Sequence, residues 1–197
     1  MIILKNDKNS ISQVVQAVQQ GKIVILPTDT VYGFSGIVDL KNSKETYHTD
    51  VAIRAVKGRA ETKPLIQLIA KPEDIYKYTN DEIPACVLEK WPGALTVIVN
   101  IKEDAPLQEV PKTVAFRCPG DEWLRNIIEL SNAPLYSTSV NRSGKPVLSH
   151  IADIQKEFEA ETALIVDDGD KINALPSTIV SLQDGKANVL RQGSVII

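Results

Sequence analysis

Apolar side chains recur with helical spacing near the start of the chain. They are Ile11, Val14, Val15 and Val18. Positions i, i+3, i+4 and i+7 lie on one face of an α-helix, and Asn9 or Ser10 is suited to cap its first turn. Gly21 is suited to end it, because glycine adopts the left-handed conformation without strain. The pattern predicts a helix over residues 9–21 whose apolar face packs against other elements.

Short apolar runs alternate with further helical stretches along the rest of the chain. The strand-like runs are residues 23–26, 65–70, 94–101, 113–116, 134–136, 163–166, 177–182 and 187–190. Helices are predicted at residues 73–78, 84–91 and 122–130. The dipeptide at residues 184–185, Asp-Gly, is a two-residue hairpin signal, so at least one antiparallel pair is expected. This order predicts an α/β fold with a mixed sheet, in a single domain over residues 1–197.

Composition narrows the class of protein. Of the 197 residues, 43% are hydrophobic and 24% are charged, which is ordinary for a globular chain. A net charge of −3 argues against a protein that coats nucleic acid, because such binding needs a strongly basic face. The start of the chain does not resemble a signal peptide, and no apolar run reaches the length of a membrane span. Two distant cysteines suit a reducing compartment, so we expect a cytoplasmic protein without membrane contact.

Four short polar segments carry side chains suited to phosphate or carboxylate groups, and three of them lie where a strand gives way to a loop. They are residues 27–33 (Pro-Thr-Asp-Thr-Val-Tyr-Gly), the cations Lys57, Arg59 and Lys63, residues 137–144 (Ser-Thr-Ser-Val-Asn-Arg-Ser-Gly), and residues 176–180 (Pro-Ser-Thr-Ile-Val) with 191–193 (Arg-Gln-Gly). Each segment alone also fits an ordinary turn or a solvated basic surface.

The motifs that the chain lacks exclude several enzyme classes. There is no Walker A loop and no glycine-rich dinucleotide fingerprint. No nucleophile elbow occurs, and neither His48 nor His150 has a convincing nucleophile nearby in the sequence. No Cys/His spacing matches a zinc site. P-loop NTPases, dinucleotide-dependent enzymes, triad hydrolases and zinc proteins are therefore disfavoured.

Taken together and in this order, the segments resemble the YrdC/YciO family, the threonylcarbamoyl-AMP synthases of tRNA modification. The matching stretches are residues 27–33, 57–59 with 63–65, 92–96 (Pro-Gly-Ala-Leu-Thr), 139–141, 176–179 and 191–193. One such motif is weak evidence, but six in register over residues 21–193 are specific. The resemblance implies a twisted, open, mixed α/β sheet with a basic cavity on its concave side.

The activity that the resemblance implies is synthesis of L-threonylcarbamoyladenylate from L-threonine, bicarbonate and ATP, with Mg²⁺ accompanying ATP. No tightly bound prosthetic group and no protein metal ligand are expected. A carbamate is short-lived in water, so such a site must hold its reactants together by positioning and charge neutralisation. Direct contact with RNA or tRNA, and with a downstream threonylcarbamoyl transferase complex, is left open.

The resemblance also implies roles for individual residues. Lys57 and Arg59 are expected to be catalytic and to face the triphosphate. The expected ATP-binding residues are Arg59, Lys63, Thr113, Ser139, Asn141 and Arg191. The expected threonine-binding residues are Thr30, Arg117, Ser137 and Ser177, with Arg117 as the partner of the carboxylate.

Departures from the family pattern keep alternatives open. Leu68 and Val147 stand where some members carry polar side chains, and residues 41–50 form a longer connection than usual, for which the sequence offers no reason. The chain is expected to correspond to the short form of the family. One rival is a YciO-like paralogue that shares the cavity but lacks the synthase activity. Another is an RNA-binding module that uses Lys57, Arg59, Lys63 and Arg142 to contact phosphates.

Overall fold

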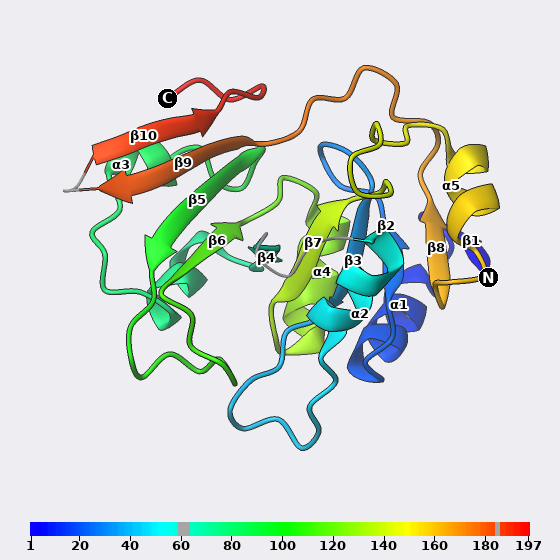
Figure 1. Cartoon of the computed structure of the whole chain (residues 1–197), viewed down its shortest axis with the longest axis horizontal. Coiled ribbons are helices and arrows are strands. Elements are labelled where there is room, and N and C mark those ends of the chain that lie inside the picture. The colour runs from blue at the N-terminus through cyan, green and yellow to red at the C-terminus, as the bar shows by residue number, and fades with distance from the viewer. Residues whose placement is uncertain (59–63, 184–185) are drawn as a thin grey trace.

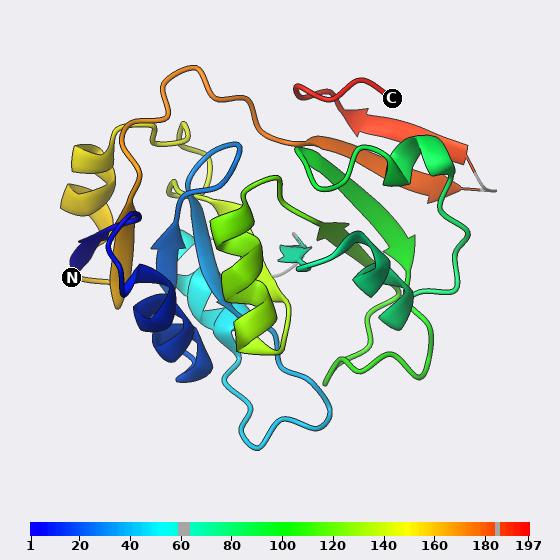
Figure 2. The same ribbon diagram turned by 180° about the vertical axis from the view of Figure 1, so that it is seen from behind.

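The computed structural model describes residues 1–58, 64–183 and 186–197, and Figures 1 and 2 show it from opposite sides. The elements in chain order are β1 Ile2–Leu4, α1 Ser10–Gln19, β2 Val24–Leu26, β3 Gly33–Ile37, α2 Thr49–Lys57, β4 Ile66–Leu68, the 3₁₀ helix η1 Pro72–Lys77, α3 Ala85–Leu88, β5 Leu95–Asn100, β6 Thr113–Arg117, α4 Glu122–Ser131, β7 Leu135–Ser139, α5 Ile151–Phe158, β8 Leu164–Asp167, β9 Thr178–Gln183 and β10 Lys186–Arg191.

The described strands form one open sheet in the order β1-β8-β2-β3-β7-β4-β6-β5-β9-β10. Its pairs are of both kinds: β1–β8, β2–β8, β4–β6 and β5–β9 are parallel, and the other neighbours are antiparallel. The last two strands pair antiparallel, as the hairpin signal predicts, although the Asp-Gly turn itself lies outside the described residues. The predicted mixed α/β fold is confirmed.

Helices cover both faces of the sheet around β2 and β8. Val24 and Leu26 of β2 pack in one cluster with α1 and α4, whereas Ile25 packs in another with α2 and α5. The alternation follows from the two-residue period of a strand. Figure 1 shows α2 and α5 in front of the sheet, and Figure 2 shows α1 and α4 in front of it from behind. The apolar run predicted at residues 23–26 contains β2, Val24–Leu26, and all three residues of this strand are buried.

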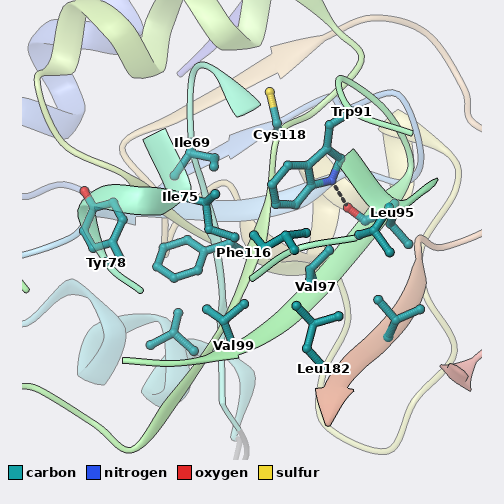
Figure 3. Packing of buried hydrophobic residues seen from close by; sticks show 14 of the residues in the cluster. Ile69, Ile75, Tyr78, Trp91, Leu95, Val97, Val99, Phe116, Cys118 and Leu182 are labelled. Atoms are coloured by element: carbon teal, nitrogen blue, oxygen red, sulfur yellow. Dashed lines mark hydrogen bonds between the residues drawn. The ribbon is translucent and has the colours of Figure 1, made fainter. Parts of the chain in front are cut away.

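A second part of the core fills the region around β5, β6 and β9 (Figure 3). Phe116 of β6 is fully buried, and its ring lies 4.9 Å from that of Tyr78, centroid to centroid. Trp91 is 6% exposed, and its indole Nε1 donates a 2.7 Å hydrogen bond to the carbonyl oxygen of Leu95. This bond satisfies the one polar atom of the side chain and fixes the segment that leads into β5.

The strand β3 has no counterpart among the predicted elements. Its sequence, Gly-Phe-Ser-Gly-Ile, lacks the run of large apolar side chains by which a buried strand is recognised. The glycine at position 36 has a packing reason, since a Cβ there would lie 2.8 Å from Cβ of Thr49 at the start of α2. The strand β1 and the helix α5 were likewise not predicted. Among the described residues, no helix has the length and apolar character to cross a bilayer.

The longer connection at residues 41–50 is held by a single carboxylate. Asp39 accepts hydrogen bonds from the backbone N–H groups of Tyr47 and His48, each at 2.8 Å. The ring of Tyr47 packs on Gly21, where a Cβ would lie 2.2 Å from the ring. These contacts bring the chain back to the sheet and start α2 at Thr49. The connection therefore positions the helix that ends at Lys57.

We predict that Ile127→Ala lowers the free energy of unfolding by about 2–5 kcal/mol, because it removes a fully buried side chain from the sheet-facing side of α4. Leu130→Ala is the matched control on the same helix, since Leu130 is 54% exposed, and it should change stability by less than about 0.5 kcal/mol. Urea unfolding followed by circular dichroism measures both. Equal losses in the two variants would contradict this packing.

Candidate active site

A cavity of about 180 Å³ collects six of the side chains that the sequence nominates. They are Thr30, Arg117, Ser137, Ser139, Ser177 and Arg191. Three of them lie at the ends of strands: Arg117 ends β6, Ser139 ends β7 and Arg191 ends β10. Gly33 begins β3 and also lines the cavity, and a Cβ there would lie 2.8 Å from Oγ of Ser137. The glycine therefore keeps the space beside Ser137 open.

Hydroxyl groups lock the first polar loop into one shape. The Thr28 hydroxyl donates to the carbonyl oxygen of Val31 at 2.8 Å and accepts from the backbone N–H of Thr30 at 3.0 Å. The hydroxyl oxygens of Thr28 and Thr30 are 2.9 Å apart. Because the single proton of Thr28 is directed at Val31, the Thr30 hydroxyl donates to Thr28. Both threonines are buried, so the loop presents a fixed arrangement of polar groups to the cavity.

Tyr32 ties the same loop to the connection between β8 and β9. Its hydroxyl donates to the carbonyl oxygen of Gly169 at 2.7 Å and accepts from the backbone N–H of Asp168 at 2.9 Å. The side chain is fully buried, and burial raises the pKa of Tyr32 to about 12, so the hydroxyl keeps its proton. The connection crosses to β9 and carries Ser177 into the cavity (Figure 1). One tyrosine thus couples two walls of the site.

Arg117 is the buried cation of the cavity. Its Nη2 lies 2.5 Å from Oδ1 of Asp29, its Nη1 donates to the Thr30 hydroxyl at 2.8 Å, and its Nε donates to the carbonyl oxygen of Gly93 at 3.1 Å. The residue is 5% exposed. A guanidinium has five N–H groups, so these three bonds leave one N–H on each terminal nitrogen for another acceptor. Two such donors suit a carboxylate.

The opposite wall is built by Ser177 and Arg191. The Arg191 guanidinium donates from Nη2 to the Ser177 carbonyl oxygen at 2.7 Å, and the Ser177 hydroxyl lies 2.8 Å from that of Thr96. Gly193 allows the backbone after β10 to lie close to the backbone before β9, since a Cβ at position 193 would lie 2.2 Å from the carbonyl oxygen of Pro176. Desolvation, and then the nearby charge of Arg117, lower the pKa of Arg191. Two guanidinium groups therefore face the same small space, which favours anionic ligands.

Lys57 is directed at the turn that follows β7. Its ammonium donates to Oδ1 of Asn141 at 2.9 Å, to the Asn141 carbonyl oxygen at 3.0 Å and to the carbonyl oxygen of Ser139. Ser139 donates to the same Oδ1 at 2.8 Å. The lysine is 2% exposed. These contacts join α2 to β7 and show Lys57 as the residue that orders the turn, while its predicted catalytic role stays a prediction.

Three nominated side chains in the described part of the chain do not line this cavity: Lys57 and Asn141, which meet at the turn after β7, and Thr113. Thr113 begins β6, whereas Arg117 ends it, so a rise of four residue steps separates them by about 13 Å. Thr113 lines a second cavity of about 240 Å³, and Pro64 is the only described residue that lines both cavities. Arg59 and Lys63 lie outside the described residues. Among the described residues, no group of three His, Cys, Asp or Glu side chains is placed to hold a metal ion.

Sequence reasoning missed the residues that support the cavity from behind. Asp29, Gly93 and Thr96 hold Arg117 and Ser177, but none of them lines the cavity. All three fall inside motifs that the sequence displays, so the motifs marked the right segments. A backbone acceptor such as the Gly93 carbonyl has no sequence signature, and only the folded chain reveals it.

We predict that Lys57→Met lowers the free energy of unfolding by about 1–3 kcal/mol, because three partly buried acceptor atoms on Ser139 and Asn141 lose the lysine as a donor. Lys8→Met is the matched control at an exposed position and should stay within about 0.5 kcal/mol of the unmodified protein. Chemical unfolding of both variants measures the difference. An unchanged midpoint for Lys57→Met would exclude the anchoring role.

Known proteins share this fold. The solved structure of Pyrococcus abyssi Sua5 in complex with L-threonine superposes with a TM-score of 0.83 at 31% identity, over 98% of this chain and 57% of that one. The chain thus spans little more than half the length of that protein. Escherichia coli YciO superposes with a TM-score of 0.78 at 21% identity, over 98% of this chain and 94% of that one, a likeness of fold alone.

Sequence comparison points the same way. A protein of Methanocaldococcus jannaschii named putative threonylcarbamoyl-AMP synthase is 32% identical over 180 residues, which cover 90% of this chain and 82% of that protein. The family model Sua5_yciO_yrdC, described as telomere recombination, matches residues 16–193. The predicted resemblance is confirmed, and the chain belongs to the Sua5/YciO/YrdC family.

Proposed function

We propose that this protein is a threonylcarbamoyl-AMP synthase. The observation that carries the proposal is the convergence of Thr30, Arg117, Ser137 and Ser177 on one cavity, in a fold that matches a solved relative complexed with L-threonine. Two arginines face this cavity, and its volume of about 180 Å³ suits an amino acid. The name of the M. jannaschii relative supports the same activity.

The proposed reaction has two chemical steps. The amine of L-threonine joins bicarbonate to give a carbamate and water. An oxygen of the carbamate then attacks the α-phosphorus of ATP, the bond between the α-phosphorus and the bridging oxygen breaks, and pyrophosphate leaves. Negative charge builds on the phosphates in the transition state. Cations that are already in place stabilise this charge and so make the main contribution to catalysis. Mg²⁺ enters with ATP as part of that substrate.

Threonine recognition is assigned to the buried end of the cavity. The two remaining N–H groups of Arg117 bind the carboxylate, and the hydroxyls of Thr30, Ser137 and Ser177 complete the contacts. The Thr30 hydroxyl is already directed by its bonds to Thr28 and Arg117, so it serves as an acceptor with little reorganisation. A fixed set of donors lowers the cost of binding, because few side chains lose freedom when the ligand arrives.

The nucleotide is assigned to the outer side of the cavity. Ser139 and Arg191 line it, and Asn141 shapes the turn beside Ser139. Arg59 and Lys63 are proposed at the triphosphate from their place in the family motif, and Thr113 at a more distant nucleotide contact. Lys57 is proposed to act beside Arg59, and its bonds to residues 139–141 support a share in placing the nucleotide turn.

The RNA-binding alternative is not favoured by the described residues. Arg142, one of its four cations, pairs with Glu157 through Nε at 2.9 Å and also with Glu161. Lys57 is buried and bound to the turn after β7. Neither cation is therefore presented to a phosphate backbone. Supply of the adenylate to a transferase complex that modifies tRNA in the cytoplasm belongs to the proposed synthase function.

The direct test is turnover by the purified protein with ATP, Mg²⁺ and bicarbonate, with and without L-threonine. We expect pyrophosphate release that requires both threonine and bicarbonate, and an adenylate whose mass equals that of threonylcarbamoyl-AMP. D-Threonine is the matched control substrate, because its carboxylate and side chain cannot occupy the same contacts together, and it should release little pyrophosphate. ATP binding with no threonine-dependent pyrophosphate would contradict the synthase and favour a YciO-like paralogue.

A further inference from the structure

Arg117 bonds a carboxylate that is not among the residues lining the cavity. Oδ1 of Asp29 is 2.5 Å from Nη2 of Arg117, and the two side chains are 21% and 6% exposed. The second oxygen, Oδ2, lies against Gly120, where a Cβ would be only 2.9 Å from it. The loop and the segment after β6 therefore leave a space that the Asp29 carboxylate fills. Hydrogen bonds between charged groups at this distance are among the strong ones in proteins.

Asp29 does not line the cavity, whereas its neighbour Thr30 does. It therefore reaches a ligand only through Arg117. Together with Thr30 and Gly93, it uses three of the five guanidinium N–H groups. A planar guanidinium bonded at all three of its nitrogens has no freedom to rotate. These three acceptors therefore fix the directions of the two remaining N–H groups.

Asp29 also balances charge. Arg117 and Arg191 lie close enough for the charge of Arg117 to disfavour protonation of Arg191. Arg117 is 5% exposed whereas Arg191 is an exposed residue, so it is chiefly the charge of Arg117 that needs a partner within the protein. The carboxylate of Asp29 offsets one of the two charges from outside the cavity. The cavity keeps a net positive character without placing an acidic group beside an anionic ligand.

We propose that Asp29 is a positioning residue for L-threonine, which orients and charge-balances Arg117 so that its two free N–H groups hold the substrate carboxylate. This inference rests on the proposed function, since it names how that site selects an α-carboxylate. Asp29→Asn keeps the shape and removes the charge. Because a misplaced donor costs one to two orders of magnitude, the variant should bind L-threonine about tenfold to a hundredfold more weakly.

The test is calorimetric titration of unmodified protein, Asp29→Asn and Asp29→Glu with L-threonine and with L-threoninol, which lacks the carboxylate. Asp29→Asn should lose the preference for threonine over threoninol, whereas its affinity for ATP should change little. Its melting temperature should fall, because buried Arg117 loses its charged partner, so binding is compared at a temperature where the variant is folded. Asp29→Glu retains a carboxylate and should keep threonine affinity within about threefold. Asp104→Asn, at a side chain that is 83% exposed, is the matched control and should behave as the unmodified protein.

Two results would overturn the inference alone: an Asp29→Asn variant that still prefers threonine as strongly as the unmodified protein, or equal losses in the Asn and Glu variants. Equal weakening for threonine and threoninol would likewise exclude action through the carboxylate partner. Failure of the proposed function gives a different result. If the unmodified protein binds no L-threonine, both the proposed function and this inference are overturned. Parallel circular-dichroism spectra show that each variant is folded before titration.

Discussion

Arg117 carries a full positive charge on a side chain that is 6% exposed, and the site is built around the need to satisfy it. An ion removed from water is costly unless partners replace the lost hydration. Here the partners come from two distant parts of the chain: the loop after β2 supplies Asp29 and Thr30, and the segment before β5 supplies the Gly93 carbonyl. Satisfying one guanidinium thus draws together strands that are not neighbours in sequence.

The same logic extends to the other walls of the cavity. Tyr32 joins the first loop to the connection that delivers Ser177, and Lys57 joins α2 to the turn after β7. Each is a buried side chain that bonds to another segment, Tyr32 to backbone atoms and Lys57 to backbone carbonyls and the Asn141 side chain. Such bonds are lost together when the segments separate, so the loops are coupled to the core rather than free on its surface. The shape of the cavity is therefore fixed by hydrogen bonds of buried polar groups as much as by hydrophobic packing.

Sequence patterns predicted the elements that have strong periodicity or apolar runs. The helix near residues 9–21, the buried strand at β2 and the closing hairpin all appear with bounds shifted by one or two residues at most positions. The strand β3 was missed because it consists of glycine, serine and only two large apolar residues, and its burial comes from α2 and β7. Tertiary packing, not local propensity, makes it a strand.

The motifs predicted which residues meet in the cavity, but not what each of them contacts there. They nominated Thr30, Arg117, Ser137 and Ser177 correctly as neighbours in one cavity. They grouped Thr113 with the nucleotide residues, which stays a prediction, and the structure places Thr113 at the opposite end of β6 from Arg117. They gave Asp29 no role, because whether a carboxylate faces a ligand or a neighbouring arginine depends on side-chain direction. That direction is set by contacts from other strands, which no single segment encodes.

The measurement that tests this account most directly is a crystal structure of the protein with bound L-threonine. The account predicts the threonine carboxylate within hydrogen-bond distance, about 3 Å, of both terminal nitrogens of Arg117, with the Asp29 contact retained. It also places the amine toward Ser139 and the nucleotide side of the cavity, where the carbamate must meet ATP. Threonine bound elsewhere, or with its carboxylate turned away from Arg117, would contradict the account.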